Sequence, residues 1–290
     1  MSALSLTATP TSAATALQLD PGQFEHLARI IRDHFGIHLT DEKRMMLSMR
    51  MLKMMRTDGY TDFNAYFEDR LRHPAQETLS ELVNHVSTNH THFWREPEHF
   101  EFYQKVALPE ILDRRRRRGG QPDLRVWCAA SSTGEEPYTL AMLQREALGP
   151  AASRWKGGLL ATDISTRALQ TAREGIYPKD SVAMLPAHLR QRYLKPLDGD
   201  RVVMIDALKA DVLYRRLNLV SSTIPLRGDL DAIFCRNVMI YFEESTKKTL
   251  VEQLYRLLTP GGYLFIGHAE TLNNLNTRFA FIKPGLYRRG

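Results

Sequence analysis

The chain has few cysteines and lacks the long apolar runs of a membrane protein. Its two cysteines among 290 residues, Cys128 and Cys235, each lie in an apolar stretch, so we expect buried thiols, no disulfide and a cytoplasmic protein. No apolar run reaches the ~20 residues that cross a bilayer. The first twenty residues have neither a basic start nor a compact apolar centre, so we expect residues 1–20 to be a disordered tail and not a signal peptide.

The glycine patterns of the common phosphate-binding loops are also absent. Leu124–Ala130 has the apolar character of a buried parallel strand, and the turn that follows it contains one glycine, Gly134. Glu135 and Glu136 then begin a helix, where they would repel a pyrophosphate but suit a cationic ligand with amines and hydroxyls. S-adenosylmethionine is such a ligand. The turn therefore predicts either an S-adenosylmethionine site or a well-capped surface turn.

Basic residues are in modest excess, with 39 Lys and Arg against 33 Asp and Glu, a net charge of +6. This balance favours an acidic partner. Part of the excess lies in Arg114–Arg118, which follows an apolar-periodic segment, so we expect the exposed end of a helix. Aromatic and basic residues are not interleaved as on an RNA-binding platform, and we expect no nucleic-acid partner.

Histidines are frequent before the arginine run, but they do not form a metal-binding pattern. His85, His90, His92 and His99 have no cysteine or acidic cluster at ligand spacing. Zinc sites combine such ligands at short, regular intervals. We therefore expect no metal.

Residues 21–85 have the pattern of four short helices and predict a small all-helical domain. The second helix, from about Thr40 to Thr57, carries six methionines and several basic residues. At about 100° per residue, Lys43, Arg50 and Lys53 lie within a quarter turn. This helix is either a docking surface for an acidic helical partner or a bundle helix with packed methionines and a solvated charged face.

After a polar and aromatic linker at 86–96, strands and helices alternate from about residue 122. This order predicts an α/β fold with a doubly wound parallel sheet, and the chain end predicts an antiparallel edge. Residues 176–210 interrupt the alternation, and we expect a small antiparallel β insertion at about 188–212. Asp163 ends the second strand, where it binds ribose hydroxyls or caps a helix, and Asn237 follows the strand Leu230–Cys235 with Tyr241 four residues on.

Several motifs in this order resemble the chemotaxis receptor methyltransferases, the CheR family. They are Thr88–Glu96, Ser132–Tyr138, Ala161–Asp163, Ile233–Phe242 and Gly267–Glu270. The resemblance covers about residues 22–288. It implies a helical N-terminal domain and a Rossmann-like, seven-stranded S-adenosylmethionine methyltransferase domain at 97–290. It also implies O-methylation of glutamate side chains on the cytoplasmic helices of chemoreceptors, which form an acidic helical bundle.

The resemblance also implies the site residues, by matched motif. Those implied to bind S-adenosylmethionine, or its product S-adenosylhomocysteine, are Asn89, Thr91, Arg95, Glu136, Asp163, Asn218, Leu219, Asn237 and Val238. Arg50, Lys53 and Arg56 are implied to face the receptor. Because a glutamate is already ionised at neutral pH, the transfer needs alignment and no base, and we assign Arg95 to hold the substrate carboxylate and Tyr241 to position the methyl group.

Some positions depart from the family pattern. Trp94 stands where the family usually has phenylalanine, and Ser131 and Ser165 replace more typical residues. The segment between Tyr193 and Asn218 is shorter than in members that bind a receptor's C-terminal peptide, so we do not expect that tethering here. Two alternatives remain open: methylation of RNA or another protein, and a non-catalytic module that binds S-adenosylmethionine as a regulator.

Overall fold

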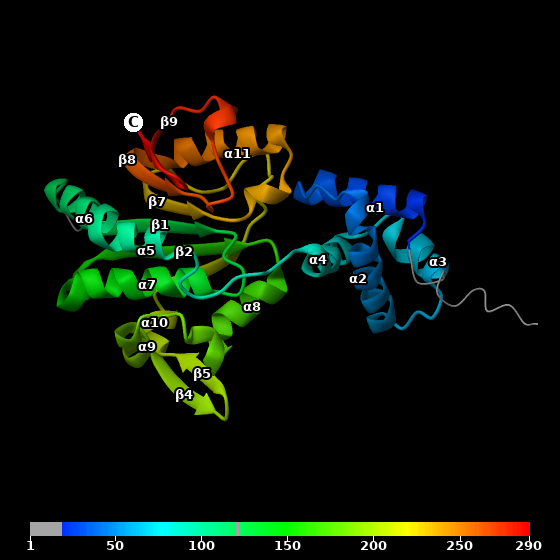
Figure 1. Ribbon diagram of the computed structural model, residues 1–290, viewed down its shortest axis with the longest axis horizontal. Helices are drawn as coiled ribbons and strands as arrows, with labels where there is room; N and C mark the ends of the chain where they lie inside the picture. Colours follow the sequence, from blue (N-terminus) through cyan, green and yellow to red (C-terminus); the bar gives the residue numbers. More distant parts are fainter. Residues whose placement is uncertain (1–18, 120–121) are drawn as a thin grey trace, which may run out of the picture. The chain divides into compact units, whose positions relative to one another are not determined.

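The computed structural model describes residues 19–119 and 122–290, which form two compact units (Figure 1). Among the described residues, one unit contains 19–34 and His38–Val86, and the other contains Phe35–Ile37 and the chain from Ser87 onward. Of the predicted tail, residues 1–18 lie outside the described residues. Leu19 is buried and its backbone N–H donates to Ser48 Oγ at 3.0 Å, so it belongs to the first unit and not to a tail.

The first unit is helical. Its helices are α1 (Pro21–Phe35), α2 (Arg44–Thr57), α3 (Phe63–Tyr66) and α4 (Gln76–Val86). A 3₁₀ turn at Asp41–Lys43 leads into α2, and α3 continues as a π-helical turn to Leu71. Fully buried apolar side chains from α1, α2 and α4, such as Leu27, Met51 and Leu82, form the core of this unit. The predicted all-helical domain is confirmed.

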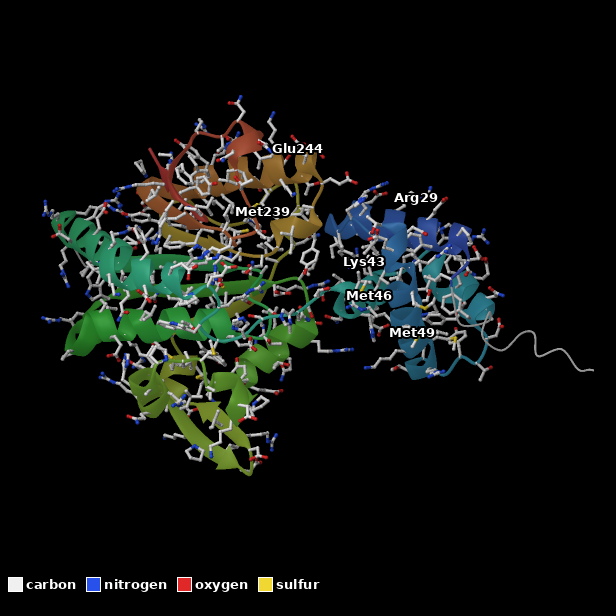
Figure 2. The ribbon with its side chains drawn as sticks, viewed as in Figure 1. Arg29, Lys43, Met46, Met49, Met239 and Glu244 are labelled. Atoms are coloured by element: carbon white, nitrogen blue, oxygen red, sulfur yellow. The ribbon has the colours of Figure 1, made fainter. Side chains whose placement is uncertain are left out.

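Helix α2 divides its methionines between two surfaces. Met51, Met54 and Met55 are buried, whereas Met45 and Met49 are 55% and 59% exposed. Met49 lines a surface groove with Leu52, Lys53, Arg56 and Thr57. Figure 2 labels Lys43, Met46 and Met49 along the helix. Packing therefore explains some of the methionines, and others lie on the surface beside basic side chains.

The residues of α2 that were expected to bind substrate differ in their surroundings. Lys53 and Arg56 are exposed, but Arg50 is half-buried and its Nη1 donates to the carbonyl of Val86 at 2.5 Å. A cation at this position satisfies a carbonyl that the C-terminus of α4 leaves unpaired. The hydrogen bond to Val86 therefore gives Arg50 a structural role within the helical unit.

The second unit begins with helices and continues into a mixed sheet. Helix α5 (Pro97–Phe102) joins α6 (Leu108–Arg117) through a π-helical turn. Within the described residues the larger sheet has seven strands, in the order β6-β2-β1-β7-β8-β10-β9. They are β1 (Asp123–Ala129), β2 (Lys156–Asp163), β6 (Val212–Arg216), β7 (Leu230–Cys235), β8 (Leu258–Phe265), β9 (Phe279–Lys283) and β10 (Leu286–Arg289). The strands β6, β2, β1, β7 and β8 are parallel, and β10 runs antiparallel to β8 and β9.

Helices cover both faces of this sheet. Successive side chains of β1 point to opposite faces: Val126 and Cys128 join the apolar cluster that contains α7 (Glu135–Leu148), and Trp127 and Ala129 join the cluster that contains α11 (Glu244–Leu257). Figure 1 shows α7 and α11 on opposite sides of the strands. The prediction of a doubly wound α/β sheet with an antiparallel edge is confirmed.

The inserted subdomain is a second, antiparallel sheet with order β3-β5-β4. Its elements are β3 (Ile176–Pro178), α9 (Ala187–Tyr193), β4 (Leu194–Asp198), β5 (Arg201–Met204) and α10 (Asp206–Lys209). The insertion thus begins at Ile176 and not near residue 188. Val212, expected at its end, instead begins β6 of the main sheet. This edge strand was not predicted because its apolar part, Val212–Tyr214, is only three residues long before two arginines.

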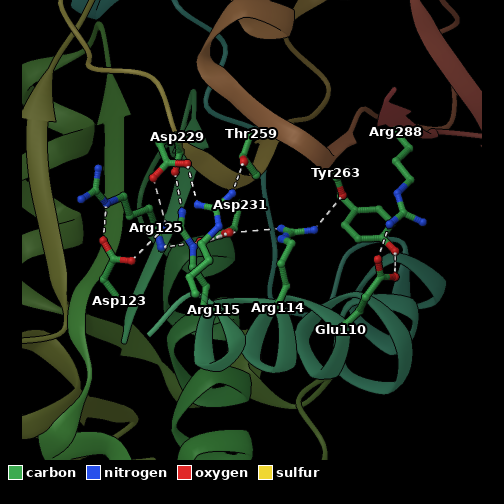
Figure 3. Close-up of polar contacts among 12 residues, drawn as sticks. Glu110, Arg114, Arg115, Asp123, Arg125, Asp229, Asp231, Thr259, Tyr263 and Arg288 are labelled. Carbon is green, nitrogen blue, oxygen red and sulfur yellow. Dashed lines mark hydrogen bonds and ion pairs between the residues drawn. The ribbon is translucent and has the colours of Figure 1, made fainter. Parts of the chain in front are cut away.

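The expectation that Arg114–Arg118 is a solvated helix end is wrong for Arg115. Arg115 is 5% exposed, and its guanidinium contacts Asp231, Asp123 and Asp229 at 2.8–3.0 Å. Arg114 also reaches Asp231. Figure 3 shows these side chains extending from α6 to carboxylates at the start of β1 and β7. A buried Asp231 needs such cations, because an unpaired carboxylate there would be costly.

Two smaller expectations concern the cysteines and the membrane. Cys128 and Cys235 are buried free thiols, as predicted. Across residues 19–119 and 122–290, none of the helices combines the length and apolar character needed to cross a bilayer.

Candidate active site

The turn from β1 into α7 has an unusual backbone. Ala130, Ser132 and Gly134 all have positive φ, at 59°, 49° and 101°. A Cβ on Gly134 would lie 2.7 Å from Tyr177 Oη and 2.9 Å from Ala172 Cβ, so both conformation and space require glycine there. Tyr177 Oη also donates to the carbonyl of Thr133 at 2.7 Å. The conformation of the turn is therefore stabilised by the hydrogen bond from Tyr177 as well as by its own backbone.

Asp163, at the end of β2, holds the other side of this turn. It is buried, and its carboxylate accepts from the backbone N–H of Ser132 and of Ser165, each at 2.8 Å. Burial raises the pKa of this carboxyl above its ordinary value of 3.8, although the backbone hydrogen bonds oppose the rise. Ser165 itself caps α8 (Thr166–Glu174) by accepting from Ala168 N–H. Asp163 thus links the first turn to the start of α8.

A second tight turn follows β7. Asn237 has φ +56°, and its backbone N–H donates to Glu270 Oε2 at 2.9 Å. The same carboxylate accepts from Gly267 N–H at 2.6 Å and from Ile240 N–H at 3.2 Å. A Cβ on Gly267 would lie 2.2 Å from Asn237 Nδ2, so the two turns pack without room for a side chain. Burial raises the pKa of Glu270 despite these donors.

A buried arginine connects this turn to α7 and to the linker before α5. The side chain of Arg236 is 1% exposed, and its Nη1 donates to Glu136 Oε2 at 2.5 Å. Its Nη2 donates to the carbonyl of Arg95 at 2.5 Å and to Glu96 Oε2 at 3.0 Å. Glu96 Oε1 in turn accepts from Asn237 Nδ2 at 3.0 Å. One network thus joins the start of α7, the end of β7 and the end of the linker.

The linker reaches this network through two residues with positive φ, Trp94 (61°) and Glu96 (57°). The ring of Trp94 stacks on Phe100, with centroids 5.3 Å apart. Arg95 is half-buried, and its Nη1 donates to the carbonyl of His90 at 2.9 Å. Asn89 and Thr91, earlier in the linker, are also half-buried.

The remaining residues expected at the site follow other strands. Asn218 and Leu219 follow β6 after one intervening residue, Leu217, and Asn218 Oδ1 accepts from Val220 N–H at 3.2 Å. Val238 and Tyr241 follow β7 and are half-buried. Because β6, β2, β1 and β7 are parallel, their carboxyl ends lie at one edge of the sheet, where ligands bind in open α/β folds. A depression beside the turn after β7 is lined by Met239, Glu244 and Glu270 among others. Figure 2 labels Met239 and Glu244.

Sequence reasoning overlooked three members of these networks: Glu96, Arg236 and Glu270. Each was part of a quoted motif but received no role of its own. A signal was present for Arg236, because a cation directly after six apolar or buried strand residues must find carboxylates nearby. Glu96 and Glu270 gave no comparable signal, since the partners that join them to other segments, Arg236 and Asn237, lie 140 and 33 residues away.

One group of side chains in the described residues has the composition of a metal site. The ligand atoms of Glu96, His99 and His268 lie within 4.8 Å of one another. However, the carboxylate of Glu96 already accepts from Arg236 and Asn237, and from His268 N–H at 3.3 Å. Buried His99 places Nδ1 3.3 Å from Glu96 Oε2. The carboxylate of Glu96 is thus occupied by donors, whereas neither ring nitrogen of His99 makes a hydrogen bond among the described residues. The absence of a metal remains a prediction.

The site's donors and charges fit S-adenosylmethionine. Glu136 and Asp163 offer carboxylates to a cation and to hydroxyls, and Ser131 Oγ is buried with no hydrogen-bond partner among the described residues. A sheet wound on both faces, with these carboxylates at the carboxyl ends of β1 and β2, has the layout expected of an S-adenosylmethionine-dependent methyltransferase.

Comparison with known families gives the assignment. Residues 89–287 match the S-adenosylmethionine-binding domain of CheR methyltransferases, and residues 22–87 match the all-alpha domain of the same family. The chain therefore belongs to the CheR methyltransferase family, as its motifs indicated.

Curated relatives agree over nearly the whole chain. A chemotaxis protein methyltransferase of Borreliella burgdorferi is 35% identical over 273 residues, covering 94% of this chain and 96% of the relative. That of Escherichia coli is 37% identical over 274 residues, covering 93% and 92%. A solved S-adenosylmethionine-dependent methyltransferase from Methanosarcina mazei is 14% identical over 52% of this chain and 54% of its own, with a TM-score of 0.30, and adds nothing to the assignment.

Proposed function

We propose that this protein transfers a methyl group from S-adenosylmethionine to glutamate side chains on the cytoplasmic helices of chemoreceptors, forming γ-methyl esters. Family membership and the names of the relatives support the chemotaxis setting. The observation that carries the proposal is the network at the carboxyl ends of β1 and β7. There Arg236 donates a hydrogen bond to Glu136, and Asp163 accepts one from Ser132 in the turn between β1 and α7.

In this proposal the carboxylates of Glu136 and Asp163 bind the amino group and the ribose hydroxyls of S-adenosylmethionine. The same edge of the sheet contributes four further residues, Asn218, Leu219, Asn237 and Val238. The linker contributes Asn89, Thr91 and Arg95. S-adenosylmethionine supplies a methyl group activated by its sulfonium. The protein's task is to align it with a carboxylate oxygen, since a glutamate with a pKa near 4.3 is already ionised at neutral pH.

Arg95 and Tyr241 have the proposed catalytic roles. The guanidinium of Arg95 holds the substrate carboxylate and keeps it ionised, because a buried carboxyl would otherwise bind a proton. Tyr241, half-buried after β7, positions the methyl group by facing the sulfonium. Neither role requires a general base.

The exposed basic side chains of α2, Lys53 and Arg56, are the proposed contacts for the acidic receptor, together with Arg50. The groove at Met49 beside them offers an apolar surface for a helix. We do not propose that the β insertion tethers the C-terminal peptide of a receptor. The reaction is placed on the cytoplasmic side of the membrane because the substrate helices lie there.

The test is incubation with methyl-labelled S-adenosylmethionine and a purified chemoreceptor cytoplasmic fragment. Mild alkali should release volatile labelled methanol from the fragment, which is diagnostic of a carboxyl methyl ester. Label that resists alkali, or that enters RNA or another protein, would contradict the proposed substrate. Binding of S-adenosylmethionine without any transfer would leave the fold assignment in place and point to a regulatory module.

A further inference from the structure

Arg236 is a buried cation with more than one anionic partner. Its side chain is 1% exposed, and those of its partners Glu96 and Glu136 are 13% and 16% exposed. Burial opposes its charge, but the two carboxylates outweigh this effect and raise its pKa. Its guanidinium also lies 5.1 Å from the ring centroid of Phe100. A cation buried this deeply is costly unless its contacts are well formed.

The groups that it contacts come from separate parts of the chain. Nη1 reaches Glu136 in the first turn of α7, and Nη2 reaches both the carbonyl of Arg95 and the carboxylate of Glu96 in the linker. Glu136 is held from its other side too, because Cys128 Sγ donates to Oε1 at 3.2 Å. The planar guanidinium can serve these acceptors together, whereas a lysine amine is a point charge without that geometry.

We propose that Arg236 is a positioning residue, which fixes the carboxylate of Glu136 and the backbone of Arg95 relative to each other. The inference rests on the proposed function, in which Glu136 binds the cofactor and Arg95 the substrate carboxylate. Arg236 itself touches neither ligand. Through Glu136 it sets the affinity for the cofactor, and through the Arg95 carbonyl it sets the rate of transfer.

The charge of the network supports this assignment. One guanidinium faces two carboxylates, so the group retains a negative charge beside the first turn of α7. This charge favours a cationic ligand, provided that the carboxylate of Glu136 stays within hydrogen-bonding distance of that ligand. Removing Arg236 would leave Glu96 and Glu136 to repel each other and to move apart.

The experiment measures binding of S-adenosylhomocysteine by calorimetry to the full chain carrying Arg236→Gln, Arg236→Lys, Glu136→Gln, or Arg236→Gln with Glu136→Gln. We expect Arg236→Gln to weaken binding about tenfold, and Arg236→Lys to recover only part of the loss. In the Glu136→Gln background, Arg236→Gln should have little further effect, because its route to the cofactor is already gone. With a methylatable substrate, kcat should also fall on the order of 100-fold in Arg236→Gln.

The matched control is Arg115→Lys, which alters another buried arginine paired with carboxylates, at the opposite end of β7. Thermal unfolding should show that Arg115→Lys and the Arg236 variants are all destabilised. Only the Arg236 variants should lose affinity for S-adenosylhomocysteine. Unchanged affinity in Arg236→Lys, or additive losses in the double variant, would overturn the inference. If Arg236→Gln does not fold, the cycle of Arg236→Lys, Glu136→Gln and the variant that carries both changes decides. Failure of the proposed function is distinguishable, since it appears as absent ester formation by the unaltered protein.

Discussion

The carboxylate of Glu96 shows how a single residue can join distant segments. It accepts hydrogen bonds from Arg236 and Asn237, and its Oε2 lies 3.3 Å from His99 Nδ1. Burial favours its neutral form, but the contacts with His99, Arg236 and Asn237 outweigh burial and lower its pKa well below its ordinary value of 4.5. Ionised Glu96 is therefore a stabilising group in the folded state.

This shift predicts a pH dependence of stability. A carboxyl whose pKa is lowered by folding contributes stability above its unfolded pKa, near 4.5, and loses it as the pH falls below 4.5 towards the folded pKa. Glu96→Gln should therefore lower the free energy of unfolding at pH 7, and the deficit should shrink below pH 4.5. Urea unfolding of both proteins across pH 3 to 7 measures this.

The control for Glu96 is Glu101→Gln, which removes an exposed carboxylate paired with Lys105. Surface pairs of this kind contribute about 0–1 kcal/mol, so little change is expected at any pH. An equal deficit for Glu96→Gln at pH 7 and at pH 3 would show that the ionised form is not what stabilises the fold.

Gly267 carries a steric prediction. An added Cβ would lie 2.2 Å from Asn237 Nδ2 and 2.9 Å from its backbone nitrogen. Gly267→Ala should displace Asn237, cost about 1–3 kcal/mol of stability, and weaken binding of S-adenosylhomocysteine measured by calorimetry. Gly228→Ala is the comparison, because its nearest neighbour would lie at 3.6 Å, an ordinary contact. Equal behaviour of the two variants would refute the steric argument.

At the scale of elements, the run Arg114–Arg118 contains two kinds of arginine. Arg115 is buried against three aspartates, whereas the side chain of Arg117 is 80% exposed and pairs with Asp113. Removing one partner of a buried pair costs about 3–5 kcal/mol, since it leaves an uncompensated charge. Arg115→Gln should show this loss in denaturant unfolding, and Arg117→Gln should stay within about 0.5 kcal/mol. A loss below 1 kcal/mol in Arg115→Gln would refute the buried network.

The same run shows where prediction from sequence succeeds and where it stops. The order of strands and helices could be predicted, because β1, β7 and their covering helices have buried apolar runs or helical periodicity. The burial of Arg115 could not be predicted, since Asp229 and Asp231 lie 114 and 116 residues further along the chain and only the sheet brings them to it. Edge strand β6 was missed for a local reason: its apolar run covers only Val212–Tyr214, which is too short to identify a strand.

The candidate site divides in the same way. Family motifs predicted Glu136, Asp163 and Asn237, which the structure places after β1, β2 and β7. What the motifs could not supply is which carboxylate each cation holds. Glu136 was expected to contact S-adenosylmethionine, and the structure pairs it in addition with Arg236, a residue 100 positions away. Such pairings depend on tertiary contacts that no local pattern encodes.

For the molecule as a whole, the proposal assigns cofactor binding and receptor binding to different units. The larger unit contains the proposed cofactor site, and α2 in the helical unit contains the proposed receptor contacts, Lys53 and Arg56. Charge reversal on α2 should therefore weaken binding of the receptor substrate without changing the affinity for the cofactor. Attraction between exposed charges is screened by salt, so the effect should be largest at low ionic strength.

The variant for this test is Lys53→Glu with Arg56→Glu, assayed for methyl transfer to a receptor fragment. The KM for the fragment should rise about tenfold or more at low salt, and the difference from the unaltered protein should narrow at high salt. The Kd for S-adenosylhomocysteine should not change. Lys105→Glu with Arg117→Glu makes the same charge change on exposed side chains of the larger unit, and it should leave the KM close to normal. If both double variants raise KM equally, recognition depends on net charge and not on α2.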